Sequence, residues 1–173
     1  NMNLFTVAMG KSADEGKRLA FNLQKVLGID AGEAMRYMGL FKQITTSFGV
    51  VSKQSTVMSE NLTQLGYDIA SYFNISTEKS FEKLQSGLAG QTRALREIGI
   101  DISQARLQQE LYNLGIREKV SNLSQADKAE LRYIAIMKQS TNAQGDMART
   151  IQTPANALRI LRAQFQITSR AIG

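Results

Sequence analysis

The most constraining feature of this sequence is how rarely proline interrupts its helix-forming residues. Pro154 is the only proline among 173 residues, and Ala, Leu, Gln, Lys, Arg and Glu, which favour helices, are frequent throughout. Two candidate strands are weak, since Gly49–Val51 is too short and Ile100–Ile102 lies between predicted helices. The sequence therefore predicts an all-α fold with little or no sheet.

Residues that cap free backbone amides mark where the predicted helices begin. Ser12, Asp30 and Ser124 each precede an acidic residue by three positions, which is the capping-box pattern. Further helix starts are predicted at Ser52, Ser76, Thr92, Ser103 and Thr153–Pro154. These starts predict about seven or eight mostly short helices.

The predicted helix ends share one sequence pattern, a glycine followed by an isoleucine. It occurs at Gly28–Ile29, Gly99–Ile100 and Gly115–Ile116, each with a leucine one turn earlier. Glycine adopts the left-handed conformation that ends a helix, and the isoleucine can fold back onto the leucine. Gly87 and Gly90 are expected to interrupt the helix that starts at Ser76. The pattern predicts a packed array rather than one rod, in a single domain over 1–173 that we expect to be a fragment of a longer protein.

Two segments have apolar seams that are compatible with coiled-coil packing. The first seam is Met58, Leu62, Leu65, Ile69 and Tyr72, and the second is Leu158, Leu161, Phe165 and Ile172. We expect part of this seam surface to be used between chains.

Because Trp is absent and aromatic residues make up only 7 %, we expect an aliphatic core of Leu, Ile and Met. The methionines at 35, 38, 58, 137 and 147 are interpreted as adaptable core filler rather than as metal ligands.

The composition excludes most familiar catalytic chemistry, because the chain has no cysteine and no histidine. Disulfides, thiolate chemistry, histidine triads and histidine-containing zinc sites are thereby excluded. Three carboxylate pairs remain, at Asp14/Glu15, Glu78/Glu82 and Asp127/Glu130. Their places near helix starts are explained by the helix dipole. We predict that the chain is not an enzyme, with no catalytic, cofactor-binding or metal-binding residue.

Binding motifs are equally incomplete. Gly10–Lys11–Ser12 resembles the end of a phosphate-binding loop, but the glycine that the loop needs is replaced by Phe5. Gly87–Gly90 lacks the flanking strands of an RNA-binding loop.

Net charge is +6, and after Asp146 the charged residues are all basic: Arg149, Arg159, Arg162 and Arg170. A helical nucleic-acid-associated protein that uses these arginines is therefore an alternative hypothesis. No uncharged run reaches the ~20 residues of a membrane span.

Three stretches, in this order, resemble a known family. They are Phe81–Ser103 (FEKLQSGLAGQTRALREIGIDIS), Leu123–Thr150 (LSQADKAELRYIAIMKQSTNAQGDMART) and Thr153–Arg162 (TPANALRILR). Together they resemble the tape measure domain near the N-terminal side of bacteriophage and prophage tail tape measure proteins. The match covers about half of the chain well, and the upstream part more loosely.

The resemblance implies a virion structural protein that acts in tail assembly and tail length determination. It implies as partners the tail tube and tail-tip proteins, tail assembly chaperones and possibly further copies of the chain. It also implies location in the virion tail after assembly in the bacterial host cytoplasm. It adds no catalytic residue and no cofactor. Because glycines end the helices so often, we expect this segment not to be the extended ruler itself.

Overall fold

The computed structural model describes residue 10 and residues 13–27 and 29–146. Within them the chain forms seven α-helices and one 3-10 helix, with no strand, so the all-α prediction is confirmed. The elements are α2 (Ala13–Leu27), α3 (Ala31–Ser47), α4 (Ser52–Phe73), α5 (Thr77–Leu88), α6 (Arg93–Arg96), α7 (Gln104–Asn113), η2 (Val120–Asn122) and α8 (Gln125–Gln139). Several predictions fall outside the described residues, namely those on Ser12, Gly28, Met147, the C-terminal arginines and the helix expected from Thr153.

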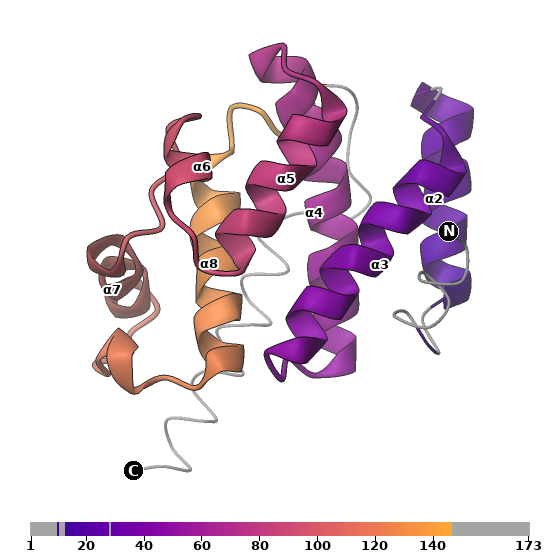
Figure 1. Ribbon diagram of the computed structural model, residues 1–173. Coiled ribbons are helices and arrows are strands. Elements are labelled where there is room, and N and C mark those ends of the chain that lie inside the picture. The colour runs from indigo at the N-terminus through magenta and orange to yellow at the C-terminus, as the bar shows by residue number, and fades with distance from the viewer. Residues whose placement is uncertain (1–9, 11–12, 28, 147–173) are drawn as a thin grey trace.

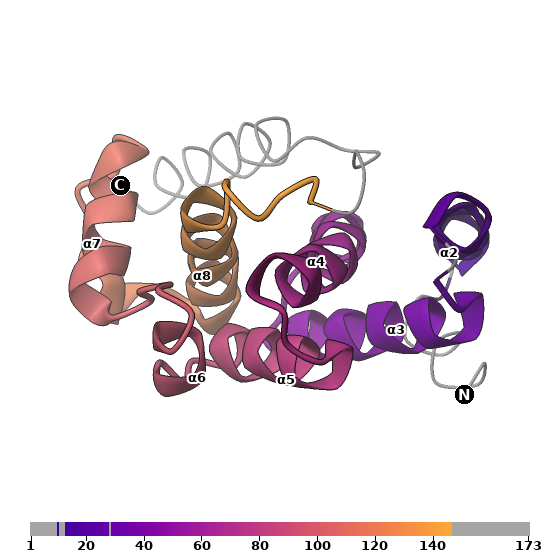
Figure 2. The ribbon, with the colours of Figure 1, turned by 90° about the horizontal axis from the view of Figure 1, so that it is seen from above.

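Helices that follow one another in the sequence pack side by side (Figure 1). α3 contacts α2 and α4, α5 contacts α4 and α6, and α7 contacts α8. Seen from above, α2 and α7 lie at opposite ends of the array, and α4 lies between α2 and α8 (Figure 2). α8 follows last in the sequence and returns to contact α3 and α5. The result is an array of short helices, as the helix starts and stops predict.

Side-chain caps set the starts of four helices. Asp30, Ser76, Ser103 and Ser124 each accept a hydrogen bond from the amide three residues later, over 2.8–3.3 Å. Each cap pairs one of the amides that lack a partner in the first helical turn. α4 is an exception, because Val51 occupies its cap position and makes no side-chain cap.

The predicted glycine–isoleucine stops form as expected at two described sites. Gly99 has φ +80°, and the next amide, of Ile100, donates to the carbonyl of Leu95 over 3.0 Å. Gly115 ends α7 in the same way. These bonds pair carbonyls that would otherwise be left free at the helix end.

The same stop also occurs where the glycine–isoleucine pattern does not predict it. Gly49, Asn74 and Gly90 have positive φ, and the residue after each donates to the carbonyl five positions back. Valine follows the first and glutamine the third, while the second is not a glycine. Gly87 was expected to interrupt α5, but it lies inside that helix, so this prediction was wrong.

The core is not purely aliphatic, which corrects the expectation from composition. Phe81 of α5 stacks on Tyr37 of α3 with ring centroids 3.6 Å apart, and it meets the edge of Tyr67 of α4 at 5.1 Å. Phe41 of α3 also contacts Phe81, with ring centroids 5.9 Å apart. These four aromatic residues meet where α3, α4 and α5 pack together, and a percentage cannot reveal which residues meet.

Two glycines allow helices to approach closely around this core. A Cβ atom at Gly66 of α4 would collide with the ring of Phe81. A Cβ at Gly87 of α5 would collide with the side chain of Leu95, which explains why this glycine is tolerated inside a helix. The small residues therefore serve packing between α4, α5 and α6.

The first predicted seam is buried within one chain. Met58, Leu62, Leu65 and Ile69 are at most 1 % exposed, while Tyr72 at the end of α4 is 46 % exposed. These four side chains are therefore unavailable to a second chain in this fold. The methionines of the described residues, Met35, Met38, Met58 and Met137, are all buried, in agreement with their interpretation as core filler.

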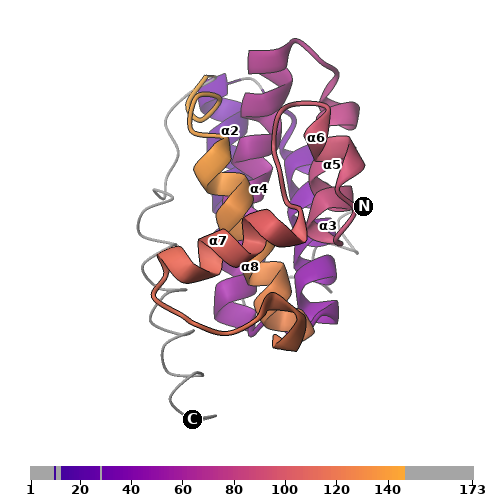
Figure 3. The same cartoon turned by 90° about the vertical axis from the view of Figure 1, so that its left-hand side faces the viewer.

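α7 runs across α8 at one end of the array (Figure 3). Glu110 of α7 is buried and pairs with Lys138 of α8 at 2.9 Å and with Arg106 of its own helix at 3.3 Å. Both cations remain about one-third exposed, so this ion pair is partly solvated. It fixes the crossing of the two helices.

Candidate functional site

α4 holds many polar side chains in the interior of the protein. The buried ones are Gln54, Ser55, Thr56, Ser59, Glu60, Asn61, Thr63, Gln64 and Asp68. Buried polar groups cost stability unless they are paired, so such a concentration identifies the first candidate site. Two buried clusters use these residues, one toward α2 and α3 and one toward α8.

The first cluster is built around Lys42, a lysine that is only 2 % exposed. Its ammonium donates to Thr56 Oγ1 over 2.8 Å, to Ser52 Oγ over 3.1 Å and to the Ser52 carbonyl. Burial lowers the pKa of Lys42, and the negative charge of Glu60 opposes that shift. The three acceptors pair all three N–H groups, which explains how α3 accommodates a lysine on its inner face.

Glu60 faces this cluster from α4 and is 6 % exposed. Burial, and after it the charge and hydrogen bonding of the neighbouring Glu15 of α2, raise its pKa to about 7 against the opposing charge of Lys42. One carboxyl oxygen, Glu60 Oε1, has no hydrogen-bond partner. Two carboxyl groups in contact are most stable when they share a proton. The contact between α2 and α4 therefore depends on the protonation of Glu60.

The second cluster lies between α4 and α8. Asn61 donates to the hydroxyl of Tyr133 over 2.8 Å, and both residues are buried. Glu130 of α8 is 1 % exposed, and burial followed by the charge of Asp127 raises its pKa to about 7. Gln64 Oε1 and Glu130 Oε2 have no hydrogen-bond partner. This cluster is only partly paired, which distinguishes it from the Lys42 cluster.

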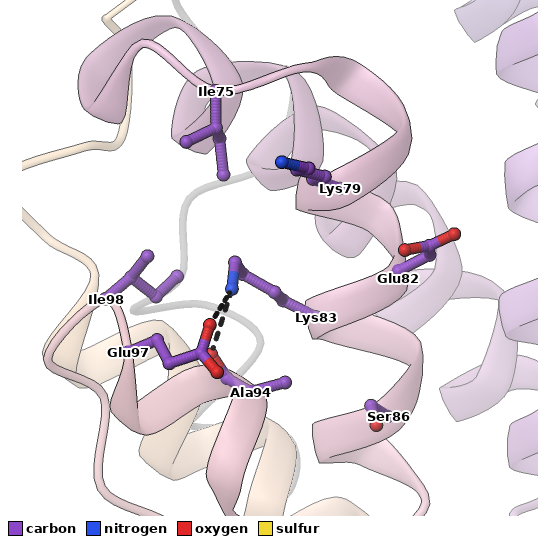
Figure 4. A pocket seen from close by; sticks show the side chains of 8 residues that line it. All are labelled: Ile75, Lys79, Glu82, Lys83, Ser86, Ala94, Glu97 and Ile98. Carbon is purple, nitrogen blue, oxygen red and sulfur yellow. Dashed lines mark hydrogen bonds and ion pairs between the residues drawn. The ribbon is translucent and has the colours of Figure 1, made fainter.

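A third candidate is an open surface cleft between α5 and α6, with a volume of about 610 Å³ (Figure 4). Ile75, Ala94 and Ile98 give it apolar walls, and Lys79 and Glu82 lie along α5 at its edge.

Within this cleft Lys83 pairs with Glu97 at 2.8 Å, and this lysine holds the pKa of the Glu97 carboxyl below its ordinary value. Two of the four charged residues that line the cleft are thus paired with each other. Its apolar walls can accept an apolar side chain.

Most of the residues that the sequence offered as candidate sites do not come together in the structure. Gly10 is described, whereas Lys11 and Ser12 lie outside the described residues, as do the four C-terminal arginines. Gly87 lies inside α5, and Gly90 follows the helix with a positive φ, so the two glycines do not form a separate loop. Of the carboxylate pairs, Asp127 and Glu130 interact electrostatically, and Glu82 alone of its pair lines the cleft.

The sequence patterns did not single out the buried Lys42 and Glu60, and they placed Glu130 only in a carboxylate pair near a helix start, with no indication of its burial. A signal was present, because Lys42 continues the buried spacing of Met35, Met38 and Thr45 on α3. A charged residue inside an apolar helical spacing is the pattern that would have identified it.

The described residues contain no group of three or more carboxylates that could hold a metal ion. Among those same residues, no helix is both long and apolar enough to cross a bilayer. Comparisons with protein-family models, curated proteins and solved structures found no match to this chain.

Proposed function

We propose that the chain is a structural module of a phage tail tape measure protein, acting through protein–protein contacts during tail assembly. The observation that supports this is where the family-like stretches lie. Phe81–Ser103 forms α5, α6 and the stop after α6, and the described part of Leu123–Thr150 forms α8. These stretches are separated in the sequence but contact each other through α5 and α8.

Specific hydrogen bonds join the two stretches. Gln139 of α8 accepts from the amide of Asp101 over 2.8 Å and donates to the carbonyl of the same residue over 2.7 Å. Arg132 donates to the carbonyl of Leu88 over 3.3 Å and lies against Gly90. Residues that resemble one family therefore form one packed unit, which is expected when a resemblance reflects a shared domain rather than scattered chance matches.

The lengths of the helices support a role in assembly rather than a role as the extended segment that sets tail length. The longest described helix, α4, has 22 residues and spans about 33 Å. A single helix over the whole chain would span about 260 Å. In this proposal the module binds tail tube subunits, tail-tip proteins or assembly chaperones, and it contributes little to tail length through its own extension.

An in-frame deletion in a phage that carries the gene tests this role. We expect the chain to be present in purified tails, and we expect the deletion to stop tail assembly or to shorten tails by far less than ~260 Å. Lys119→Gln, an exposed substitution outside the cleft, is the control and should assemble normally. Absence of the chain from tails, or normal tails after deletion, would refute the proposal.

A titration with duplex DNA across salt concentrations tests the nucleic-acid alternative. The structural proposal expects no saturable binding near physiological salt. Binding that weakens steeply with salt, and that is lost when the C-terminal arginines are replaced, would favour the alternative.

A further inference from the structure

The cleft between α5 and α6 is an open surface whose apolar walls are anchored in the protein. Ile75, Ala94 and Ile98 are half-buried, and both isoleucines pack against the hydrophobic core. Their remaining apolar surface is in contact with water in a cleft of about 610 Å³. A small molecule is bound best by a pocket that encloses most of its surface, so an open cleft suits a segment of another protein better.

The lysines of α5, rather than its glutamates, are directed toward this cleft. Lys79 and Lys83 are four residues apart, so they share a face of the helix, and both line the cleft. Figure 4 shows the Lys79 side chain extended over the cleft, whereas the carboxylate of Glu82 points away from it. The cations of α5 therefore contribute more to the charge inside the cleft than this acid does.

The other charges around the cleft leave it positive. Lys83 pairs with Glu97 at 2.8 Å, and the positive charge of Arg93 also acts on this carboxylate. Lys79 is exposed, and it forms no ion pair with any residue that the structure describes. Three cations thus lie around one carboxylate, and such a field attracts a negatively charged group.

We propose that the cleft binds an acidic segment of a partner protein that inserts one large apolar side chain between Ile75 and Ile98. A carboxylate of the same segment pairs with the ammonium of Lys79 at the rim. This inference rests on the proposed function, in which the chain acts through protein–protein contacts, and it adds the surface and the partner chemistry of one such contact.

A second copy of the chain fits the cleft less well than an acidic partner does. Phe21 and Tyr112 are the most exposed large apolar side chains of the described residues. Lys17 and Lys25 lie four residues to either side of Phe21 on the same helix face, and their charges would repel Lys79. Tyr112 has only uncharged residues at the positions three and four away. Neither side chain brings the carboxylate that the cleft attracts.

Selection from a peptide library on the purified full chain tests the proposal. The probe is an mRNA-displayed library of short random peptides. The enriched peptides should combine a large apolar residue with Asp or Glu no more than one helical turn away. Failure to enrich any peptide, or enrichment of basic or uncharged peptides alone, would overturn the proposal.

Charge reversal in the cleft gives a sharper readout. The enriched peptides are titrated by fluorescence anisotropy against wild type, Lys79→Glu and Lys53→Glu, where Lys53 is an exposed lysine of α4 outside the cleft. Lys79→Glu should weaken binding about fivefold or more at low salt, because an attraction becomes a repulsion. Lys53→Glu should change binding by less than about twofold. Equal affinities for wild type and Lys79→Glu, or equal weakening by both variants, would overturn the proposal.

Two further measurements separate folding defects and other occupants from loss of the contact. Glutamate is favourable in the first turn of α5, so Lys79→Glu should keep the wild-type circular dichroism spectrum. A peptide whose acids are changed to lysine should bind this variant more tightly than it binds wild type, which an unfolded variant would not do. A dimer detected by light scattering and abolished by Lys79→Glu would assign the cleft to a second copy and overturn the proposal.

The two proposals fail in distinguishable ways. If deletion of the module stops tail assembly but the purified chain binds no acidic peptide, the cleft proposal is wrong and the proposed function stands. If acidic peptides bind in the cleft but tails form normally after the deletion, the binding surface is correct and the proposed function is wrong.

Discussion

Replacing Glu60 with glutamine should change how the stability of the protein depends on pH. Burial raises the folded-state pKa of Glu60 to about 7 from an ordinary value of 4.5. Between these pH values the folded state binds more protons at this site than the unfolded state. The free energy of unfolding therefore falls as pH rises from about 4.5 through about 7.

The size of the effect follows from the shift in pKa. At about 1.36 kcal/mol per pH unit, full ionisation of Glu60 costs about 3 kcal/mol of stability. Roughly 2 kcal/mol of that loss falls between pH 5 and pH 8. Glutamine has the same shape and cannot ionise. The free energy of unfolding of Glu60→Gln, relative to that of the wild type, should therefore be about 2 kcal/mol higher at pH 8 than at pH 5.

Urea unfolding followed by circular dichroism at both pH values measures this difference. Glu130 titrates in both proteins and so cancels in the comparison between variant and wild type. Glu82→Gln, at an exposed position, should follow the wild type at both pH values. The free energies of unfolding of Glu60→Gln and wild type could instead change by the same amount between the two pH values, within about 0.5 kcal/mol. That result would show that the pKa of Glu60 is not raised in the folded protein.

Three further substitutions test the packing of the array, each by urea unfolding. Tyr133→Phe should cost about 1–2 kcal/mol because Asn61 loses its buried partner, whereas Tyr112→Phe at an exposed site should be neutral. Gly66→Ala should cost about 2–3 kcal/mol because the new methyl group meets Phe81, and Gly99→Ala, with open space around it, should cost about 1 kcal/mol from its positive φ alone. Lys42→Met should cost about 2 kcal/mol, since Ser52 and Thr56 lose their donor, and it should raise the NMR-measured pKa of Glu60. Equal costs for the members of a pair, or an unchanged Glu60 titration, would contradict these assignments.

The helices were predictable because their ends are encoded locally. The caps at Asp30 and Ser124 and the stop at Gly99 depend on residues within six positions, and the sequence displays them all. What could not be predicted is which side chains meet across helices. Phe81 stacks on Tyr37, 44 positions earlier, and no local pattern reports that distance.

The candidate sites were less predictable for the same reason. The pKa of Glu60 is raised first by burial and then by Glu15, which α2 brings against it. The pKa of Glu130 is raised first by burial and then by Asp127. A sequence shows that a residue can ionise, but only the fold shows how much water remains around it. Lys42 is the partial exception, since its spacing on α3 indicates an inward position.

The packing of most helices against a neighbour in the sequence has a consequence for how the chain acquires its structure during synthesis. Pairs such as α2 with α3 and α4 with α5 need no distant segment, so they can form as soon as both members have left the ribosome. α8 differs, because it must close a long loop to reach α3 and α5. The arrival of α8 is therefore expected to be the slow event, and a ribosome-stalled chain that ends before Gln125 should already contain the α3–α4–α5 unit.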